Sequence, residues 1–420
     1  MINYQNPKHN FLDEMKRTSR GNYVVQIPEE IVLEILKELP AKSLLRFKCV
    51  SKGWRNMIED PEFVDAYRVR SRKHSTNILV RKNCFGMNQE GKNRPMDKFF
   101  LVDSNRKSVP IAVPELIYEE MFLSNFVRPY VMRPVEGLVC LNNLIWNPTT
   151  GKIIDLPPRN ITNSRDIIAR GYKLELEIEI FLGFDASSKK YKVLSICHTR
   201  VQEKSHPEVF IVGWQDEELP DTKILTLGTN SWRNTTNCSL SEELQRGFRV
   251  YGFCSIKSVI YFQINFVANI LAFDFSQEKF QLISFPDEDT MPRMIEVRDC
   301  LGLMNRECTK IWILEDFKDR KWNVVNILWP SSWIVNPLYF SNEDGSMFVK
   351  PVGSVQSGEI LFKCTKRKKS LGLRGNSYSY ELSYFCYDME QRSTGTFHIL
   401  DAYKEDTVDI YPKHVETLYP

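Results

Sequence analysis

The pattern of apolar residues changes once along the 420-residue chain, and this change limits the folds that the chain can adopt. Between residues 23 and 67, apolar side chains recur at the spacing of amphipathic helices, as at Ile31, Ile35 and Leu39. After residue 77, short apolar runs alternate with polar turns, which is typical of β-strands. The sequence therefore predicts a small helical domain followed by a large β domain, and the length also favours two domains.

Proline and small polar residues predict where the helices begin and end. Pro28 suits a first helical position, Pro40 ends that helix, and Ser51 can cap a later one. Three or four short helices in about 45 residues cannot bury all their apolar surface, because so small a unit buries only about 60% of its surface. The rest must be covered by a partner protein or by the chain's own β domain, and the helical spacing leaves both alternatives open.

Charge and cysteine usage exclude several classes of protein. The chain has 56 Lys and Arg against 53 Asp and Glu, and 14 of the basic but only 10 of the acidic residues lie within residues 1–75. A near-neutral body does not favour nucleic acid as a partner, and no apolar run approaches the ~20 residues that span a bilayer, so we expect no membrane association. Ten cysteines occur without a CxxC motif, which favours a reducing compartment, the cytoplasm and/or the nucleus.

The β region contains a repeat of about 40 to 50 residues. Strand-to-turn markers are separated by 44, 38, 45, 44 and 42 residues, and they are Asp103, Asn147, Asp185, Asn230, Asp274 and Asp316. Asp344 and Asp388 add another interval of 44 residues. This period with several strands per repeat predicts a propeller-like, kelch-like all-β domain of about six to seven blades. A pair of β-sandwiches without a true repeat is the alternative.

The helical segment contains four short motifs in a fixed order. They are Ile27-Pro28-Glu29-Glu30-Ile31, Leu39-Pro40 through Phe47, Cys49 through Trp54, and Asp60-Pro61-Glu62-Phe63. In this order and spacing the motifs resemble an F-box. The resemblance implies docking on a Skp-type adaptor, which joins such modules to a cullin-based ubiquitin ligase. The positions that the resemblance implies as adaptor-facing or core are Ile27, Pro28, Ile31, Leu39, Leu44, Leu45, Cys49, Val50 and Trp54.

The β region resembles the plant F-box-associated domain, in a superfamily that includes the S-locus F-box proteins of pollen recognition. The matching motifs include Gly137 to Cys140, Ile145 to Lys152, Leu182 to Asp185 and Leu271 to Phe275. The expected fold class is therefore α+β multidomain. The expected organisation is an N-terminal tail (1–22), the F-box (23–67), a linker (68–76) and the propeller-like domain (77–415).

We find no pattern that predicts an enzyme, a metal site or a cofactor. No two of the six histidines have the i, i+4 spacing of a zinc helix, and no nucleophile elbow or phosphate-binding loop is present. Cys140 or Cys364 could be paired with a distant histidine, but a buried strand cysteine is the favoured interpretation. We expect no catalytic residue.

Two features are candidates for binding a target protein. Lys366 and Arg367 belong to a basic run that could be a nuclear import signal, a contact for an acidic substrate, or a solvated loop. Trp329 and Trp333 flank an apparent loop, whereas the other tryptophans are expected in the core.

The function predicted is that of a substrate receptor, with the adaptor, a cullin and an unidentified target protein as partners. The alternatives are an F-box scaffold or transcription regulator outside the ligase, and an enzyme built on a propeller.

Overall fold

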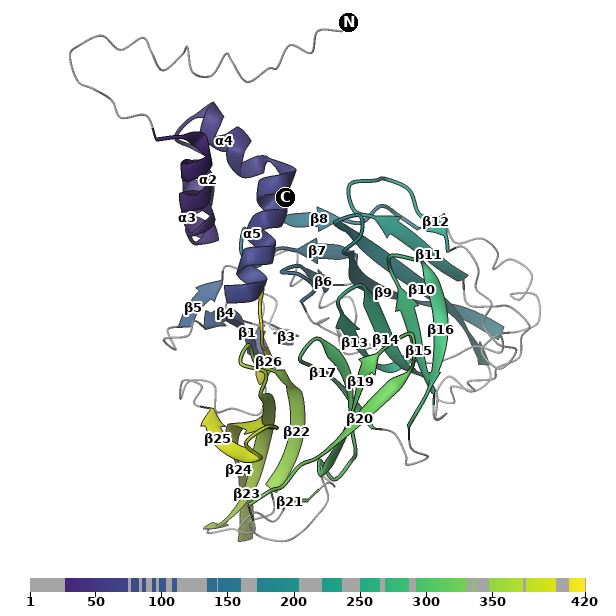
Figure 1. The fold of residues 1–420 in the computed structure, drawn as a ribbon. Helices are drawn as coiled ribbons and strands as arrows, with labels where there is room; N and C mark the ends of the chain where they lie inside the picture. The colour runs from purple at the N-terminus through teal and green to yellow at the C-terminus, as the bar shows by residue number, and fades with distance from the viewer. Residues whose placement is uncertain are drawn as a thin grey trace, which may run out of the picture.

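A computed structural model places the four helices of the described residues above a β domain and gives the arrangement of most of the chain (Figure 1). The described residues are 27–74, 77–82, 85–87, 93–95, 98–102, 108–111, 134–141, 143–159, 172–203, 221–235, 250–264, 269–286, 292–330, 335–336, 347–372, 375–397 and 408–419.

The helices begin at the predicted residues. They are α2 (Glu29–Lys37), α3 (Ala41–Phe47), α4 (Lys52–Glu59) and α5 (Pro61–His74). Pro28 and Pro40 directly precede α2 and α3. The Ser51 hydroxyl accepts a hydrogen bond of 3.1 Å from the Trp54 backbone N–H at the start of α4, as the capping prediction requires.

The strands form six sheets that are the blades of a propeller, and a separate hairpin consists of β2 (Phe85–Met87) and β3 (Asn93–Pro95). Blade 1 consists of β26 (Val408–Tyr411), β1 (Ile78–Lys82), β4 (Lys98–Val102) and β5 (Ser108–Ile111). Blade 2 consists of β6 (Val139–Leu141), β7 (Leu144–Trp146) and β8 (Ile153–Asp155). Blade 3 consists of β9 (Tyr172–Asp185), β10 (Lys190–Glu203), β11 (Asp221–Thr226) and β12 (Arg233–Asn234). Blade 4 consists of β13 (Val250–Ile256), β14 (Val259–Ile264), β15 (Asn269–Asp274) and β16 (Lys279–Ser284). Blade 5 consists of β17 (Arg293–Val297), β18 (Cys300–Met304), β19 (Lys310–Asp316) and β20 (Lys321–Asn326). Blade 6 consists of β21 (Val335–Asn336), β22 (Met347–Ser354), β23 (Ile360–Gly372), β24 (Gly375–Asp388) and β25 (Ser393–Phe397).

Six apolar layers lie between successive blades and close the ring. The layer between blades 6 and 1, for example, contains Leu361 and Tyr384 from one blade and Val80 and Ile410 from the other. Equivalent layers join each of the other five neighbouring pairs. Each sheet therefore packs against two different neighbours, which a pair of sandwiches would not do. The propeller prediction is confirmed, with six blades.

The middle strands of the blades are apolar on both faces because each face meets a neighbouring blade. In β15, Ile270 and Ala272 pack toward blade 5, whereas Leu271 and Phe273 pack toward blade 3. Burial on both faces accounts for the continuous apolar run of β15, whereas a strand with one buried face would alternate apolar and polar residues.

A repeated turn explains the spacing of most of the markers. Five turns begin with an Asn or Asp whose side-chain oxygen accepts hydrogen bonds of 2.7 to 3.3 Å from the backbone N–H groups two and three residues later. These residues are Asn147, Asp185, Asp274, Asp316 and Asp388. The fourth residue after each one has a positive φ between 51° and 76°. These local bonds reverse the chain between two strands.

The upper blade count of seven is wrong because two markers belong to one blade. The turn at Asp185 joins β9 to β10, and Asn230 lies between β11 and β12 of the same sheet. Asp103 and Asp344 lie outside the described residues.

Residues 68–74 of the expected linker (68–76) are instead the second half of α5, which continues to His74, and residues 75–76 lie outside the described residues. Arg68 and Ser71 are buried there, against acidic and backbone groups that lie far away in the sequence. The basic composition looks like a solvated connection only because these partners cannot be identified from the local sequence. In the described part of the chain, no helix combines the length and apolar character needed to cross a bilayer.

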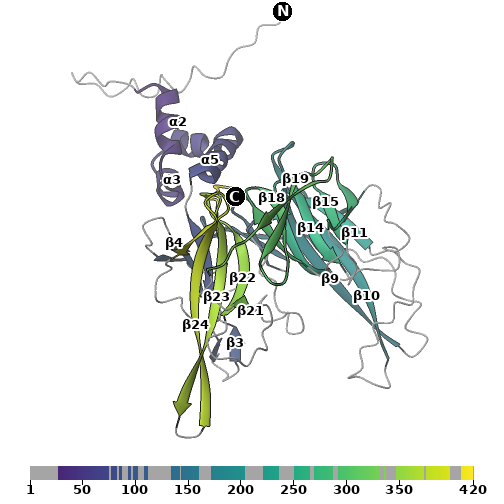
Figure 2. The same ribbon diagram turned by 60° about the horizontal axis from the view of Figure 1, so that its bottom comes forward.

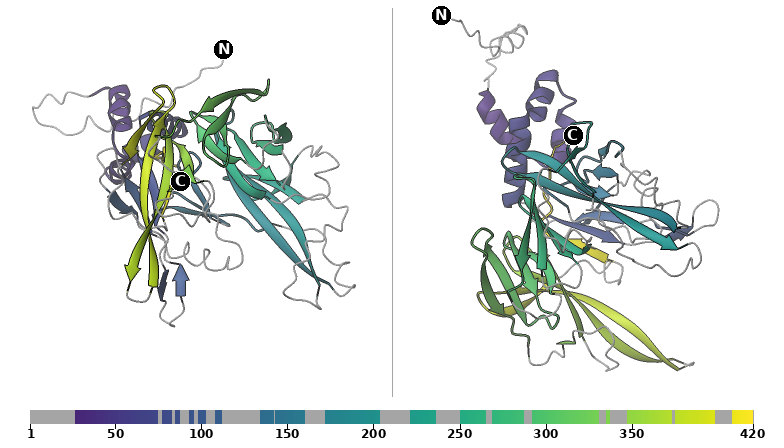
Figure 3. Two further views of the ribbon diagram at one scale, coloured as in Figure 1. Left: turned by 90° about the horizontal axis from the view of Figure 1, so that it is seen from below. Right: turned by 90° about the vertical axis from the view of Figure 1, so that its right-hand side faces the viewer.

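Two strand pairs extend beyond their blades, on the side away from the helices (Figures 2 and 3). They are β9 with β10 in blade 3 and β23 with β24 in blade 6. Their outer residues pair only with each other among the described strands, since β11 and β22 end earlier.

We predict that Gly183→Ala destabilises the propeller by about 1 to 3 kcal/mol, because the added methyl group would overlap the Phe275 ring of the next blade. Gly395→Ala is the control, since its methyl group would meet no atom within 4 Å. Thermal unfolding of both variants measures the difference. Equal unfolding temperatures would show that the contact between blades 3 and 4 is not tightly packed.

Candidate functional site

Three isoleucines in α2 and just before it are exposed to solvent. Ile31 and Ile35 lie on one face of α2 at a four-residue spacing, and Ile27 directly precedes Pro28, the N-cap residue of the helix. The accessible fractions of Ile27, Ile31 and Ile35 are 55%, 50% and 50%. We call these three residues the apolar helix face. Leu36 points to the other side of α2 and is buried in the core of the helical domain. Exposure of large apolar side chains in a row marks an interaction surface.

The other expected adaptor residues divide between the surface and the core. Pro28 and Cys49 are exposed, and Val50 is 64% exposed. Leu39, Leu45 and Trp54 are half-buried, whereas Leu44 is fully buried. Binding of an adaptor by any of these nine residues stays a prediction. Ile35 was not among the expected residues, although its spacing from Ile31 places both on one face.

The end of the chain completes the core of the helical domain. Leu418 packs among Leu36, Leu44 and Tyr67, and only 2% of its surface is accessible. Part of the apolar surface of the helices is therefore covered by the protein's own C-terminal segment, residues 412–419, while the apolar helix face stays uncovered. Coverage by the chain itself is therefore observed on one side of the domain, whereas coverage of the apolar helix face by a partner protein stays a prediction.

Glu416 connects this segment to three parts of the chain. Its carboxylate accepts hydrogen bonds from the Ala41 backbone N–H (3.2 Å), the Tyr67 hydroxyl (2.9 Å) and the Asn77 amide (3.3 Å). Burial and the neighbouring Glu416 carboxylate raise the pKa of Tyr67 far above its usual value, so the phenol remains a donor. A carboxylate at the start of α3 also compensates N–H groups that lack helical partners.

The same C-terminal segment is bound to the propeller. The Asn147 amide donates to the backbone carbonyls of Thr417 and Tyr419, both at 3.0 Å. The rings of Tyr419 and Tyr191 lie 4.7 Å apart, and the backbone N–H of His414 donates to Asn77. The segment thus joins the helices to blades 1, 2 and 3.

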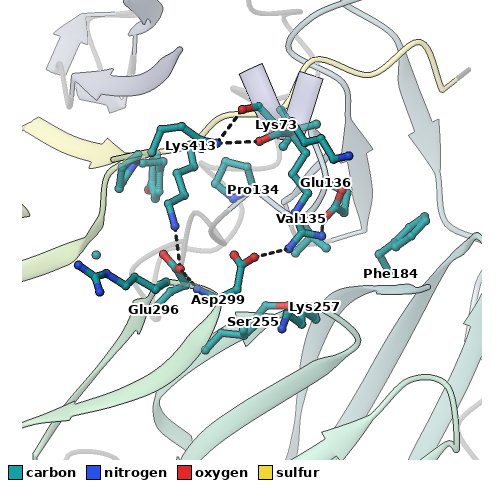
Figure 4. Close-up of a pocket in the computed structure, with 18 of the residues that line it drawn as sticks. Lys73, Pro134, Val135, Glu136, Phe184, Ser255, Lys257, Glu296, Asp299 and Lys413 are labelled. Carbon is teal, nitrogen blue, oxygen red and sulfur yellow. Dashed lines mark hydrogen bonds and ion pairs between the residues drawn. The ribbon is translucent and has the colours of Figure 1, made fainter. Parts of the chain in front are cut away.

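Ion pairs position α5 over a cavity of about 1040 Å³ at the centre of the ring (Figure 4). Arg68 forms an ion pair with Glu136, and Arg72 contacts Glu136 at 2.9 Å and Asp299 at 3.3 Å. Both Arg68 and Glu136 are about nine-tenths buried at the side chain, so the loss of either partner would leave a buried charge uncompensated.

The C-terminal end of α5 is also held by a hydrogen-bond donor. The Gln356 amide, in the turn between β22 and β23, donates to the carbonyls of Arg72 (3.1 Å) and Lys73 (3.0 Å). The last carbonyls of a helix have no partner within the helix, so this amide satisfies them. The helical domain is therefore oriented on the propeller by polar contacts as well as by the C-terminal segment.

The expected target-binding residues lie in different places. Trp329 packs between blades 5 and 6, with its ring 5.0 Å from that of Phe362 and its indole N–H donating to Cys308 at 2.8 Å. Lys366 is exposed in β23, and Arg367 follows it in that strand. The solvated loop expected at this basic run is wrong, because the run is paired with β24 residue by residue. Trp333 lies outside the described residues.

The cysteines considered as nucleophiles are inaccessible. Cys140 and Cys364 have no accessible surface, and burial raises the pKa of each thiol to about 12. A thiol in this environment is not a nucleophile at neutral pH. Within the described ranges, no group of three or more His, Cys, Asp or Glu could hold a metal ion.

The family profile described as F-box associated beta propeller domain matches residues 92–416, and the F-box domain profile matches residues 25–65. The chain therefore belongs to the family of F-box proteins with an F-box-associated β-propeller domain. F-box protein At1g47790 of Arabidopsis thaliana is 27% identical over 384 residues, covering 85% of this chain and 84% of the relative. F-box protein At3g10240 of the same plant is 26% identical over 433 residues, covering 96% and 94%.

We predict that Glu416→Ala destabilises the helical domain by about 2 kcal/mol or more, because the hydrogen bonds from Ala41 and Tyr67 to the half-buried Glu416 carboxylate are lost. Hydrogen exchange of α3 and α5 amides would measure the effect as faster exchange. Glu390→Ala is the matched control, since the Glu390 side chain is 76% exposed in its ion pair with Arg298. Equal exchange in the two variants would contradict the role of Glu416.

We predict that His414 makes the protein less stable in acid. Burial lowers the pKa of His414 from 6.5 to about 4 in the folded chain. The unfolded chain therefore binds the proton first, and stability falls as the pH decreases from about 6.5 to 4, by about 3 kcal/mol at most. His414→Gln should flatten this part of the profile of unfolding temperature against pH. An unchanged slope in the variant would assign the acid sensitivity to other groups.

Proposed function

We propose that the chain is the substrate-recognition subunit of an SCF-type ubiquitin ligase. In this proposal the F-box binds a Skp-type adaptor, the adaptor joins the chain to a cullin, and the propeller binds a target protein for ubiquitination. The observation that carries the proposal is the apolar helix face, which stays exposed on an F-box whose core side chains, such as Leu36 and Leu44, are buried.

The chemistry of the apolar helix face fits a protein partner. Full burial of one large aliphatic side chain stabilises a complex by about 1.5 to 3 kcal/mol, so three isoleucines in a row supply a substantial apolar contact. Side chains at i and i+4 are the anchors by which a helix binds an apolar groove. Val50, which is also exposed, adds apolar area on the same small domain.

The proposed mechanism is proximity. A receptor that holds its target beside the recruited conjugating enzyme raises the effective concentration of target lysines and leaves bond chemistry to other subunits. F-box proteins with propeller domains are generally non-catalytic adaptors of this kind. A fixed orientation between the two domains supports this mechanism, and Glu416 and the Arg68–Glu136 ion pair provide such an orientation.

We also propose that the protein acts in the cytoplasm and/or the nucleus. Eight cysteines of the described ranges are free thiols, and six of these eight are buried. Reducing compartments keep such thiols unpaired, whereas oxidising ones favour disulfides.

We predict that the double variant Ile31→Glu with Ile35→Glu loses adaptor binding, because each anchor contributes about 2 kcal/mol or more when it is central to an interface. A pull-down of the full chain with a purified Skp-type adaptor measures the loss. Val324→Glu is the matched control, because Val324 is also an exposed aliphatic residue (46% accessible) but lies on blade 5. The Val324→Glu variant should bind the adaptor normally.

Unchanged adaptor binding by the double variant would contradict the proposed function. Leu44 is unsuitable for this test, because a charge at a fully buried position would unfold the domain. Co-purification of a cullin with the tagged chain separates the ligase subunit from a scaffold or transcription regulator that acts outside the ligase.

A further inference from the structure

The cavity beneath α5 is lined by charged residues that come from distant parts of the chain. Its volume of about 1040 Å³ is sufficient for a small-molecule ligand. Six cationic but only three anionic residues line it, so the lining has an excess of three positive charges, as large as the formal net charge of the whole chain. The cationic residues are Arg68, Arg72, Lys73, Lys257, Arg298 and Lys413.

The three carboxylates of the lining are engaged by other residues of the same cavity. Glu136 and Asp299 form ion pairs with the two arginines of α5. The Glu296 carboxylate lies 2.9 Å from the Lys413 ammonium and also accepts a hydrogen bond of 3.0 Å from the Ser354 hydroxyl. These carboxylates therefore compensate three of the six cations, and the charge of the other three remains.

The remaining cations are Lys73, Lys257 and Arg298. Within the described ranges, neither lysine has an ion-pair partner, and both are accessible to solvent. Arg298 lies 3.0 Å from the carboxylate of Glu390, whose side chain is 76% exposed, so water competes for this pair. In the view of Figure 4, Lys73 on α5 lies at the top of the cavity and Lys257 of blade 4 lies at the bottom.

The backbone places two of these cations at unusual positions. Lys257 and Arg298 are the first residues of two-residue turns, which join β13 to β14 and β17 to β18. Their φ angles are 52° and 50°, and such turn positions favour Gly, Asn or Asp, because a longer side chain crowds the backbone. Non-glycine residues in this conformation cluster at ligand sites, so the turns are a second observation in favour of a ligand.

We infer that the cavity binds a small molecule that carries two or more phosphate groups. Each phosphate group has a charge of about −1.5 to −2 at pH 7 and three acceptor oxygens, so two such groups match the excess of three positive charges. Lys and Arg both donate charge-assisted hydrogen bonds to phosphate, and a concave site concentrates their positive potential. A single carboxylate would compensate only one of the three charges.

A ligand at this position would contact both domains. Lys73 belongs to α5, whereas Lys257 and Arg298 belong to blades 4 and 5. Since a ligand that binds only the folded state stabilises it, binding should raise the unfolding temperature of the full chain. The inference is independent of the proposed ligase role, because no residue of the apolar helix face lines the cavity.

The test is isothermal titration of the full chain with inorganic pyrophosphate at pH 7.5 and low salt. Lys73→Gln and Lys257→Gln each remove one positive charge from the cavity. Arg320→Gln is the matched control, because Arg320 is exposed, has a φ of 52° in the turn between β19 and β20, and does not line the cavity. Citrate, a polycarboxylate, and the peptide Gly-pSer-pSer-Gly are the comparison probes.

We expect each lysine variant to weaken pyrophosphate binding about tenfold, since each loses a charge-assisted hydrogen bond, and Arg320→Gln to weaken it less than about twofold. Saturating pyrophosphate should raise the unfolding temperature of the unmodified chain but not that of the double lysine variant. Unfolding without ligand verifies that each variant is folded.

Three results would overturn the inference. They are absence of pyrophosphate binding, equal weakening by the lysine variants and Arg320→Gln, and binding of citrate or of the phosphopeptide as tight as that of pyrophosphate. Equal weakening would mean that pyrophosphate responds only to the net charge of the chain. Tight binding of the phosphopeptide would assign the cavity to a polypeptide instead of a small molecule.

Discussion

The C-terminal segment is the constraint on which both domains depend. It directly follows β26, which pairs with β1, joins the two ends of the β domain and closes the ring. The residues that follow place Glu416 at the start of α3 and Leu418 in the core of the F-box. Since the helices come first in the chain and this segment last, the F-box core is complete only when the whole propeller has been made. Ring closure and domain orientation are thus a single cooperative arrangement.

This arrangement divides the apolar surface of the F-box in two. One side is covered from within the chain by Leu418, and the other side, at Ile31 and Ile35, is exposed. The Arg68–Glu136 ion pair lies between the F-box helix α5 and the propeller and helps to define the orientation of the two domains.

Local signals predicted the features that depend on neighbouring residues. Pro28 and Ser51 identified helix starts because capping uses groups within a few residues. Asp274 and Asp316 identified turns for the same reason, and their spacing led to the propeller. The blade count was uncertain because a turn of this kind can also follow the first strand of a blade. The basic run was expected in a loop because its pairing with β24 cannot be identified from the local pattern. The role of Trp329 in target binding stays a prediction.

The sequence by itself determined the helical domain, the repeating β domain and the family to which the chain belongs, since periodicity, caps and turn residues act over short distances. Only the tertiary structure decided which apolar side chains remain uncovered. Ile31 and Leu36 belong to one amphipathic helix, but Leu418 reaches only the side that contains Leu36. Tertiary structure also decided the partners of the basic stretch after Tyr67, because Arg72 contacts Glu136 and Asp299, which lie far along the chain. Burial depends on partners that are distant in sequence, and local patterns do not identify them.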